Sequence, residues 1–279
     1  LPFQGSYEAV SVLQDKERYR SFLRDNGFNC PELHVFSSAE EAAASADSLR
    51  YPVIAKPVDS AGSKGCSRVD GPEGLREAVG YALSFSRDGR CIVEQFLEKS
   101  GDSSDADAFL VDGEFRCVSF TSQLFDPGVP NPYTPAAYAM PASMPAWAQA
   151  ELVSELQRLA DLLRLGSGVF NVETRVAIDG RAYIMESSPR GGGNRLCEML
   201  RLATGGATDL VRASVQAALG LPVDELSMPA YDGFWFQQML HSDHAGEFAG
   251  VEYAPGFREA HVAEEQLWVA PGARVEAFT

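Results

Sequence analysis

Two glutamates on either side of a predicted turn have the residue types and the spacing of a metal site. Asp179-Gly180 is a strong signal for a two-residue β-hairpin turn, and with that turn Glu173 faces Glu186 while Asn171 faces Ser188. Two like charges in direct opposition destabilise a sheet unless a cation neutralises them. Oxygen ligands without a neighbouring Cys or His favour Mg²⁺ or Mn²⁺. The alternative is a solvated strand pair whose repulsion is screened.

An anion site is predicted beside this cation site. The strand that carries Glu186 continues through Ser188 and Arg190 into a glycine-rich run, residues 191–194, and a helix is expected near residues 196–202. An Arg side chain and the backbone N–H groups at a helix start both bind anions. Carboxylates, an Arg and helix-end amides together suit the transfer of a phosphoryl group.

A loop of glycine and serine residues could also bind phosphate. Lys56 ends a strand-like run, and the residues up to Gly65 join it to a second such run. The loop could lay backbone N–H groups over phosphate oxygens, with Lys56 as the counter-charge. It does not match the Gly-x-x-x-x-Gly-Lys-Ser/Thr pattern, which argues against a Walker-type NTPase. Taken alone, the loop is typical of a simple hairpin connection.

The apolar strand predicted over residues 93–97 ends in polar residues. Its backbone groups could bond the edge of a purine, and Glu94 could accept a hydrogen bond from the purine amino group. The alternative is an ordinary buried strand.

Helices and antiparallel strands must position these residues. Residues 8–25 have the spacing of an amphipathic helix, and residues 31–97 alternate strand-like and helix-like runs, as in a small α+β lobe. A second turn, Asp112-Gly113, predicts another hairpin. The hairpin face away from the two glutamates is predicted to pack on helices and consists of Val172, Thr174, Val176, Ile178, Arg181, Tyr183, Met185 and Ser187.

Composition and charge exclude several classes of protein. The 279 residues suffice for one large domain or two smaller ones. Acidic residues outnumber basic ones by 39 to 23, and the net charge of -16 repels nucleic acid and anionic membranes. The five cysteines include no Cys-x-x-Cys pair, and no run approaches the roughly 20 apolar residues of a membrane span. We therefore expect a cytosolic protein with reduced thiols, and we interpret the sequence as a piece of a longer protein.

Taken in order along the chain, these motifs resemble the ATP-grasp superfamily. The matching motifs are Asp15-Lys16, Lys56-Pro57, Glu94 with Leu97, Glu173, and Glu186-Ser187-Ser188-Pro189-Arg190. The resemblance implies an α+β fold of two lobes that clasp ATP, preceded in most members by a Rossmann-like domain that is largely absent here. It divides the chain into a helix left from that domain (1–30), a small lid lobe (31–97), a large lobe with the metal site (98–222) and a β-rich C-terminal segment (223–279).

The resemblance also implies a role for each site residue. The implied contacts are Lys16, Lys56, Gly62, Ser63 and Gly65 with the ATP phosphates; Glu94, Gln95 and Leu97 with adenine; Asp102 with ribose, with Asp105 and Asp107 as alternatives; Glu173, Glu186 and Ser188 with metal; Arg190 with the transferred phosphoryl group; and Gly192, Gly193 and Asn194 with substrate. Ser188 stands where the family usually has Asn, so the second metal is expected to bind more weakly.

The implied reaction forms ADP. A carboxylate attacks the γ-phosphate of Mg·ATP to give an acyl phosphate, which an amine then captures. We therefore interpret the chain as a carboxylate-amine ligase of the amino-acid type, with small-molecule partners and no nucleic acid or membrane partner. A homodimer is one assembly that the sequence leaves open. Residues 125–140 and the turn 190–194 are expected to border the acceptor pocket. The alternatives are a bicarbonate-using or purine-pathway member and an ATP-binding module without turnover.

Overall fold

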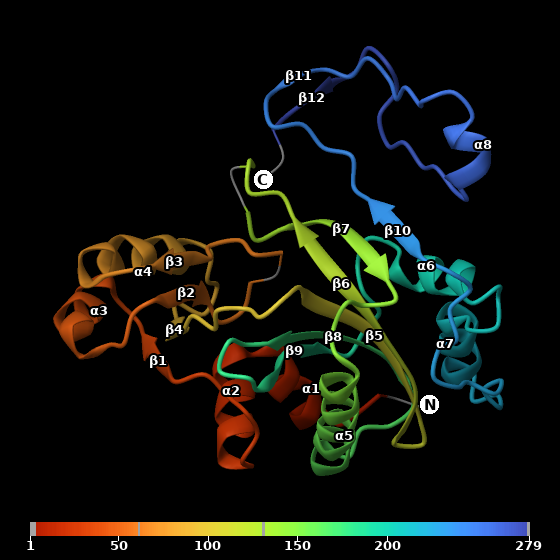
Figure 1. Ribbon diagram of the computed structural model, residues 1–279. Helices are drawn as coiled ribbons and strands as arrows, with labels where there is room; N and C mark the ends of the chain where they lie inside the picture. The colour runs from red at the N-terminus through yellow and green to blue at the C-terminus, as the bar shows by residue number, and fades with distance from the viewer. Residues whose placement is uncertain (1–3, 61, 130–131, 278–279) are drawn as a thin grey trace.

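The computed structural model describes residues 4–60, 62–129 and 132–277, and Figure 1 shows their arrangement. The helices are α1 (Tyr7–Gln14), α2 (Lys16–Asp25), α3 (Ala39–Ser45), α4 (Leu75–Ser84), α5 (Ala146–Leu163), α6 (Leu196–Ala203), α7 (Leu210–Ala218) and α8 (Phe257–His261), with 3-10 turns η1 (Ala46–Ser48) and η2 (Pro72–Gly74). The strands are β1 (Leu33–Phe36), β2 (Val53–Pro57), β3 (Ser67–Val69), β4 (Cys91–Gln95), β5 (Ser103–Val111), β6 (Glu114–Phe125), β7 (Pro135–Met140), β8 (Gly168–Val176), β9 (Ala182–Ser188), β10 (Trp235–Gln238), β11 (Gly246–Glu247) and β12 (Arg274–Val275). Across the described ranges, every helix falls short of the length or hydropathy that a membrane crossing requires.

The smaller sheet forms a lid lobe. Its four strands lie in the order β1-β4-β2-β3, and every neighbouring pair is antiparallel. Alternate residues of β2 are buried, as expected for a strand with one covered face. The covered face packs against α3 and α4 in a core that includes Leu75, Val79 and Val93.

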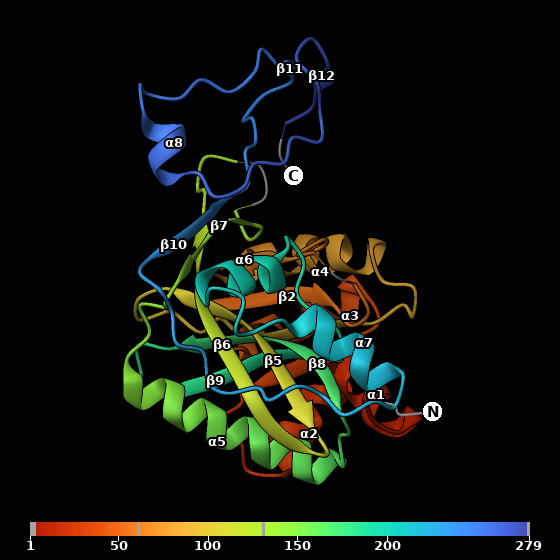
Figure 2. The same cartoon turned by 90° about the vertical axis from the view of Figure 1, so that its right-hand side faces the viewer.

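The larger sheet has six strands in the order β10-β7-β6-β5-β8-β9. One face packs against α1, α2 and α5, and α6 and α7 cover part of the other face (Figure 2). The central strand β5 is therefore buried on both sides, with Ala106 and Ala108 in the first core and Phe109 in the second. The part of the second face that α6 and α7 leave uncovered lies toward the lid.

The single helix expected over residues 8–25 is two helices, α1 and α2. They meet at Asp15, whose extended backbone ends α1. The Asp15 carboxylate begins α2 by accepting a hydrogen bond of 2.9 Å from the backbone N–H of Arg18. Leu13 and Leu23 are buried in the core beneath the large sheet, so both helices form part of the large lobe.

The first hairpin has the predicted two-residue turn. Val111 pairs with Glu114 around Asp112-Gly113, and both turn residues have positive φ, as a type I′ turn requires.

The second hairpin has a three-residue turn, so the predicted two-residue turn is wrong. The N–H of Ala177 donates to the carbonyl of Arg181 at 3.0 Å, and Gly180 takes the left-handed conformation with φ 77°. An extra residue in β9, Met185, then makes a β-bulge opposite the step from Glu173 to Thr174. The bulge offsets the longer turn, and Glu173 faces Glu186 as predicted.

Residues between the turn and the bulge face the opposite way from the prediction. Ala182 and Ile184 lie in the main core beside Val172. Tyr183 packs against Leu97 on the other face instead. Thr174 and Val176 are buried as predicted, whereas Ile178 lies in the turn and is 72% exposed.

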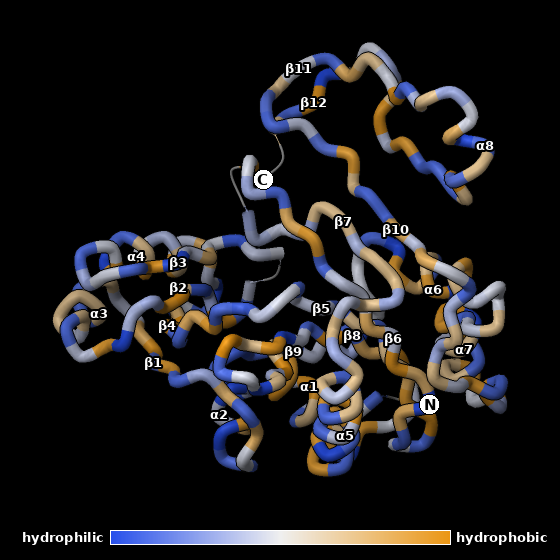
Figure 3. Tube along the Cα trace, in the orientation of Figure 1, coloured by the Kyte–Doolittle hydropathy of each residue, from blue (hydrophilic) through white to orange (hydrophobic). Residues whose placement is uncertain are grey.

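The segment after α7 contains less strand than predicted. Strand β10 has four residues and extends the large sheet beside β7, while β11 and β12 have two residues each. No described side chain from residue 221 to 277 is buried, and Phe234 and Trp268 are 93% and 81% exposed. The segment after β10 projects from the body in Figures 1 and 2, and Figure 3 shows its apolar positions scattered among polar ones.

Candidate active site

Three carboxylates form a row across adjacent strands of the large sheet. Asp105 of β5 lies opposite Glu173 of β8, which lies opposite Glu186 of β9. Directly opposed residues of antiparallel strands project from the same face. These three side chains therefore share the face that is turned toward the lid.

A second polar row lies one step along the same strands. Asp107 is opposite Asn171, and Asn171 is opposite Ser188. The Asn171 Nδ2 donates to Asp105 Oδ1 at 2.6 Å and to Asp107 Oδ1 at 3.2 Å, which joins the two rows. The Ser188 hydroxyl donates to Glu186 Oε1 at 3.4 Å.

The surroundings of these rows favour protonation or a nearby cation. Burial and the neighbouring Glu173 raise the pKa of Asp105 well above its usual value. Burial also raises the pKa of Asp107. The pKa of Glu173 is raised by desolvation in the surrounding protein and by Glu186, although the residue keeps an exposed surface. Arg190 acts in the opposite direction on both aspartates.

Both predicted phosphate lysines lie near these two polar rows, which we call the polar floor. Lys16 begins α2, and its Nζ donates to the carbonyl of Ser60 at 2.7 Å and lies 3.9 Å from Glu186 Oε2. Lys56 projects from β2 and donates to Glu94 Oε1. The charges of both lysines also lower the pKa of Glu173.

Glu94 makes ion pairs inside the protein. Its side chain is 1% exposed and accepts hydrogen bonds from Arg20 and Lys56. Burial alone would raise the pKa of Glu94, but the two cations outweigh it and lower the pKa to about 2. The predicted contact of this carboxylate with a purine amino group therefore has two internal competitors.

The other residues predicted to contact adenine or ribose lie at or just after the end of β4. Gln95 has an exposed side chain, and its N–H donates to the carbonyl of Glu32 at 2.8 Å. Leu97 is buried, and its carbonyl accepts from Arg175 at 2.8 Å. Asp102 accepts from the hydroxyl of Ser143 at 2.8 Å.

The glycine loop connects β2 to β3 and reaches the large lobe. The Ser63 hydroxyl donates to the carbonyl of Tyr133 at 3.1 Å. Gly62 and Gly65 both have positive φ, a conformation that glycine adopts without strain. A Cβ on Gly65 would also come within 3.1 Å of Phe85. This connection between β2 and β3 therefore favours glycine at both positions.

The turn after β9 is fastened to the polar floor. The N–H of Gly192 donates to Asp107 Oδ1 at 2.7 Å. Asn194 Nδ2 donates to the Tyr138 hydroxyl at 3.4 Å. Gly193 has open space where a Cβ would lie. Arg190 is exposed and donates to the carbonyl of Gly191 at 2.8 Å.

Sequence reasoning missed the placement of Asp105 and Asp107 on β5 and overlooked Arg20. The alternation Asp105-Ala106-Asp107-Ala108 is the period-two signal of a strand with one polar face, and it could have placed both aspartates. Arg20 carries no comparable signal, because its partners are distant in sequence.

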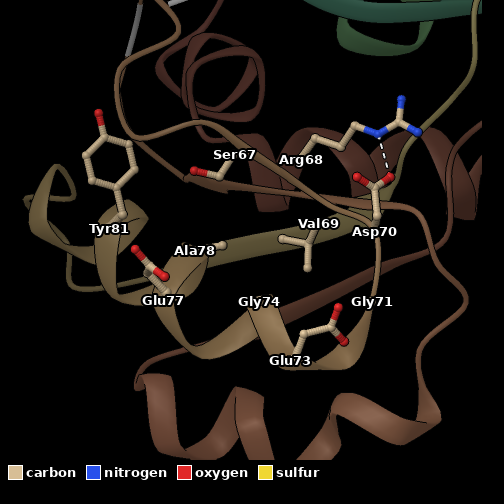
Figure 4. Close-up of a pocket in the computed structure, with 10 residues that line it drawn as sticks. All are labelled: Ser67, Arg68, Val69, Asp70, Gly71, Glu73, Gly74, Glu77, Ala78 and Tyr81. Carbon is tan, nitrogen blue, oxygen red and sulfur yellow. Dashed lines mark hydrogen bonds and ion pairs between the residues drawn. The ribbon is translucent and has the colours of Figure 1, made fainter. Parts of the chain in front are cut away.

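A hollow of about 500 Å³ lies on the outer edge of the lid, between β3 and α4 (Figure 4). Its lining residues are Ser67, Arg68, Val69, Asp70, Gly71, Glu73, Gly74, Glu77, Ala78 and Tyr81. None of them belongs to the polar rows or to the lysine pair. We therefore place the candidate active site at the polar floor between the lobes, where the charged groups converge.

The family model for the ATP-grasp domain matches residues 49–198. The chain therefore belongs to the ATP-grasp family, and the predicted fold is confirmed.

Relatives with curated names show how much of a longer protein the match covers. The carbamoyl phosphate synthase large chain of Thermotoga neapolitana is 28% identical over 219 residues, which are 78% of this chain and 19% of that protein. The formate-dependent phosphoribosylglycinamide formyltransferase of Cupriavidus taiwanensis is 30% identical over 222 residues, which are 77% of this chain and 53% of that protein. The chain thus spans about a fifth and about half of these relatives.

A solved structure supports the fold over almost the whole chain. The L-amino acid ligase of Bacillus licheniformis superposes with a TM-score of 0.73 at 21% identity, over 97% of this chain and 64% of that one. At this identity the likeness establishes the fold alone.

Proposed function

We propose that this chain is the ATP-binding part of an ADP-forming ligase that joins a carboxylate to an amine through an acyl phosphate. The observation that carries the proposal is the convergence of Glu173 and Glu186 with Lys16, Lys56 and the Arg190 turn on one polar floor. This combination of carboxylates and cations suits the transfer of a phosphoryl group.

Glu173, Glu186 and Ser188 would hold Mg²⁺ or Mn²⁺. Two carboxylates and a hydroxyl are hard oxygen donors, and Mg²⁺ is usually held by one or two carboxylates together with water and substrate phosphates. Within the described residues, no group of three or more His, Cys, Asp or Glu side chains is arranged to bind a metal ion. Water would fill the remaining coordination positions, together with phosphate oxygens when a nucleotide is bound. Bound there, the ion would neutralise phosphate charge during transfer.

The nucleotide would lie between the lid and the floor. Lys16 and Lys56 would bind the phosphates, with Gly62, Ser63 and Gly65 above them. Adenine would lie against the hinge of residues 94–97, where we expect backbone groups to make the contacts because Glu94 is already engaged by Arg20 and Lys56. Asp102 is the proposed ribose ligand.

The proposed chemistry has two steps. An oxygen of the substrate carboxylate bonds to the γ-phosphorus of ATP as the bond to the bridging oxygen breaks, which releases ADP. The amine nitrogen then attacks the acyl carbon, loses a proton and displaces inorganic phosphate. Arg190 would stabilise the charge on the phosphoryl and acyl-phosphate oxygens, while Gly192, Gly193 and Asn194 border the acceptor.

A bicarbonate-using or purine-pathway enzyme is the second candidate. The observation in its favour is the similarity, at 28% and 30% identity, to a carbamoyl phosphate synthase large chain and to a formate-dependent phosphoribosylglycinamide formyltransferase. The proposed cytosolic location stays a prediction, which cell fractionation would test, and light scattering would show whether the chain forms a homodimer.

Hydroxylamine trapping tests the proposed function. The chain is incubated with Mg·ATP, hydroxylamine and pools of amino acids or small carboxylates, and ADP and hydroxamate are measured together. Joint formation of both products with one pool supports the acyl phosphate, and bicarbonate is tested separately for ADP release. Glu186→Gln should abolish ADP release while nucleotide binding survives, and Glu114→Gln at the far end of β6 is the matched control. Nucleotide binding without turnover in the unmodified protein would support the non-catalytic module.

A further inference from the structure

Arg20 connects the two lobes from a buried position. Its side chain is 2% exposed and lies on α2. Its Nε donates to Glu94 Oε2 at 2.8 Å and its Nη2 to Glu94 Oε1 at 3.3 Å. Its Nη1 donates to the backbone carbonyl of Met185 at 2.7 Å. A single guanidinium therefore contacts a lid strand and the strand that carries Glu186.

The contact with Glu94 extends to the phosphate lysine. Glu94 Oε1 accepts hydrogen bonds from both Arg20 and Lys56. A lysine side chain has many rotamers, and fixing one of them costs entropy that a buried partner can offset. Arg20 holds the Glu94 carboxylate through both of its oxygens, so the pair fixes the direction of the Lys56 ammonium group.

The contact with Met185 supports the bulge in β9. The extra residue of a bulge is left out of the regular ladder, and Met185 is that residue. Arg20 gives its carbonyl a charged donor. With the three-residue turn alone, Glu186 would project from the opposite face of the sheet, because a shift of one residue reverses the sides. The bulge is therefore what keeps Glu186 opposite Glu173.

We propose that Arg20 is a positioning residue for both halves of the site: it orients Lys56 through Glu94 and holds Glu186 in register through the Met185 bulge. The roles of Lys56 and Glu186 rest on the proposed function, whereas the effect on the bulge does not. Arg20 contacts neither nucleotide nor metal in this proposal.

Two variants separate the two contacts. Arg20→Lys keeps a charge beside Glu94, but one ammonium group replaces a fork that serves Glu94 and Met185 together. We expect its Mn²⁺ affinity, measured by electron paramagnetic resonance without nucleotide, to fall about 10- to 100-fold, as for other lost orienting partners. Glu94→Gln leaves the Met185 bond in place and removes the charge that holds Lys56. We expect it to lose about tenfold in affinity for Mg·ATP at saturating Mg²⁺ and to keep its Mn²⁺ affinity.

Arg24→Lys is the matched control, because Arg24 lies one turn further along α2 and is 60% exposed. Both affinities and the melting temperature should stay unchanged in it. A merely structural role for Arg20 would lower both affinities and the melting temperature in parallel in Arg20→Lys and in Glu94→Gln, and that result would overturn the proposal.

Hydrogen exchange tests the bulge without metal or nucleotide. Amides of residues 183–188 should exchange faster in Arg20→Lys than in the unmodified protein or in Arg24→Lys, and equal exchange would overturn the proposal. If the unmodified protein bound no Mg·ATP, the proposed function would fail while this measurement still decided the role of Arg20. If Arg20→Lys does not fold, the double variant Arg20→Gln/Glu94→Gln, which removes both buried charges, replaces it in the same measurement.

Discussion

Asp107 accepts a hydrogen bond of 2.7 Å from the backbone N–H of Gly192. Asp107 lies on the central strand β5 and is 2% exposed, whereas Gly192 belongs to the turn that follows β9. The Cys197 thiol at the start of α6 donates to the other oxygen of the same carboxylate at 3.0 Å. Asp107 therefore fixes the turn and the adjoining helix to the floor of the sheet.

The close approach at Gly192 makes a first prediction. A Cβ there would lie 2.7 Å from Asn171 Nδ2 and 2.9 Å from both Asp107 Oδ1 and Leu196 Cδ1. We expect Gly192→Ala to lower the free energy of unfolding by about 1–3 kcal/mol, as overpacking does elsewhere, and to reduce hydroxamate formation by displacing the turn. Urea unfolding measures the first effect. Gly193→Ala is the control for the unfolding measurement alone, because its Cβ would enter open space, and equal losses of stability in the two variants would contradict the prediction.

The Ser63 bond between the lid and the large lobe makes a second prediction. Ser63→Ala removes the hydroxyl that reaches the carbonyl of Tyr133. We expect Mg·ATP binding to weaken about 2- to 10-fold, because such a bond contributes about 0.5–1.5 kcal/mol. Isothermal titration calorimetry measures the change. Ser60→Ala keeps the backbone carbonyl that Lys16 contacts and should bind like the unmodified protein; unchanged binding by Ser63→Ala would refute the role of the bond.

Ser188 makes a third prediction. By the resemblance, Ser188 stands where the family usually has Asn, and its side chain is the shorter ligand. The Ser188 hydroxyl lies 3.4 Å from Glu186 Oε1. We expect Ser188→Asn to lower the Mn²⁺ concentration that gives half-maximal ATP turnover, because the longer amide oxygen reaches further into the floor. A metal titration of the ADP-forming rate checks this. The unmodified protein is the reference, and an unchanged metal requirement in Ser188→Asn would contradict the role of Ser188 as a ligand.

The pair formed by His241 and Asp126 makes a pH-dependent prediction. His241 Nε2 lies 2.8 Å from Asp126 Oδ2, and this hydrogen bond raises the pKa of His241. A histidine whose folded pKa is raised adds stability that is fully present below its unfolded pKa of about 6.5 and is lost as the pH rises through the folded value. His241→Gln should therefore reduce stability more at pH 5.5 than at pH 9.

Thermal unfolding at the two pH values measures that difference. The exposed ring of His244 makes His244→Gln the matched control. An equal loss at both pH values in His241→Gln would show that the charged pair does not contribute.

The fold and the paired glutamates were predictable because their signals are local. The Asp-Gly turns, the alternation of apolar residues and the glycine-rich run after Glu186 are each contained in a short stretch of sequence. The prediction that Glu173 faces Glu186 rested on a turn that is one residue too short. The pairing is nevertheless correct, because the bulge at Met185 offsets the longer turn. The residues of the turn do not predict this bulge, because the residue that contacts it, Arg20, lies on α2.

The contacts of Arg20 were not predictable for a related reason. Its partners Glu94 and Met185 are 74 and 165 residues away in the sequence, and each alone looks like an ordinary strand residue. Similarly, the helix predicted over residues 8–25 breaks at Asp15 because the Asp15 carboxylate caps the start of α2. The spacing of the apolar residues does not indicate this cap. Tertiary packing decided these features.

The longer turn and the bulge also give this hairpin room to change its length during evolution. Loss of one residue from the segment 178–180 would leave a two-residue turn with Ala177 still opposite Arg181, so Glu186 and Ser188 would keep their side of the sheet. Loss of Met185 would remove the bulge and leave a regular ladder in which Glu186 still faces Glu173. Among sequences that keep both glutamates, single-residue deletions should therefore occur at the turn or at the bulge without a compensating change elsewhere in the hairpin.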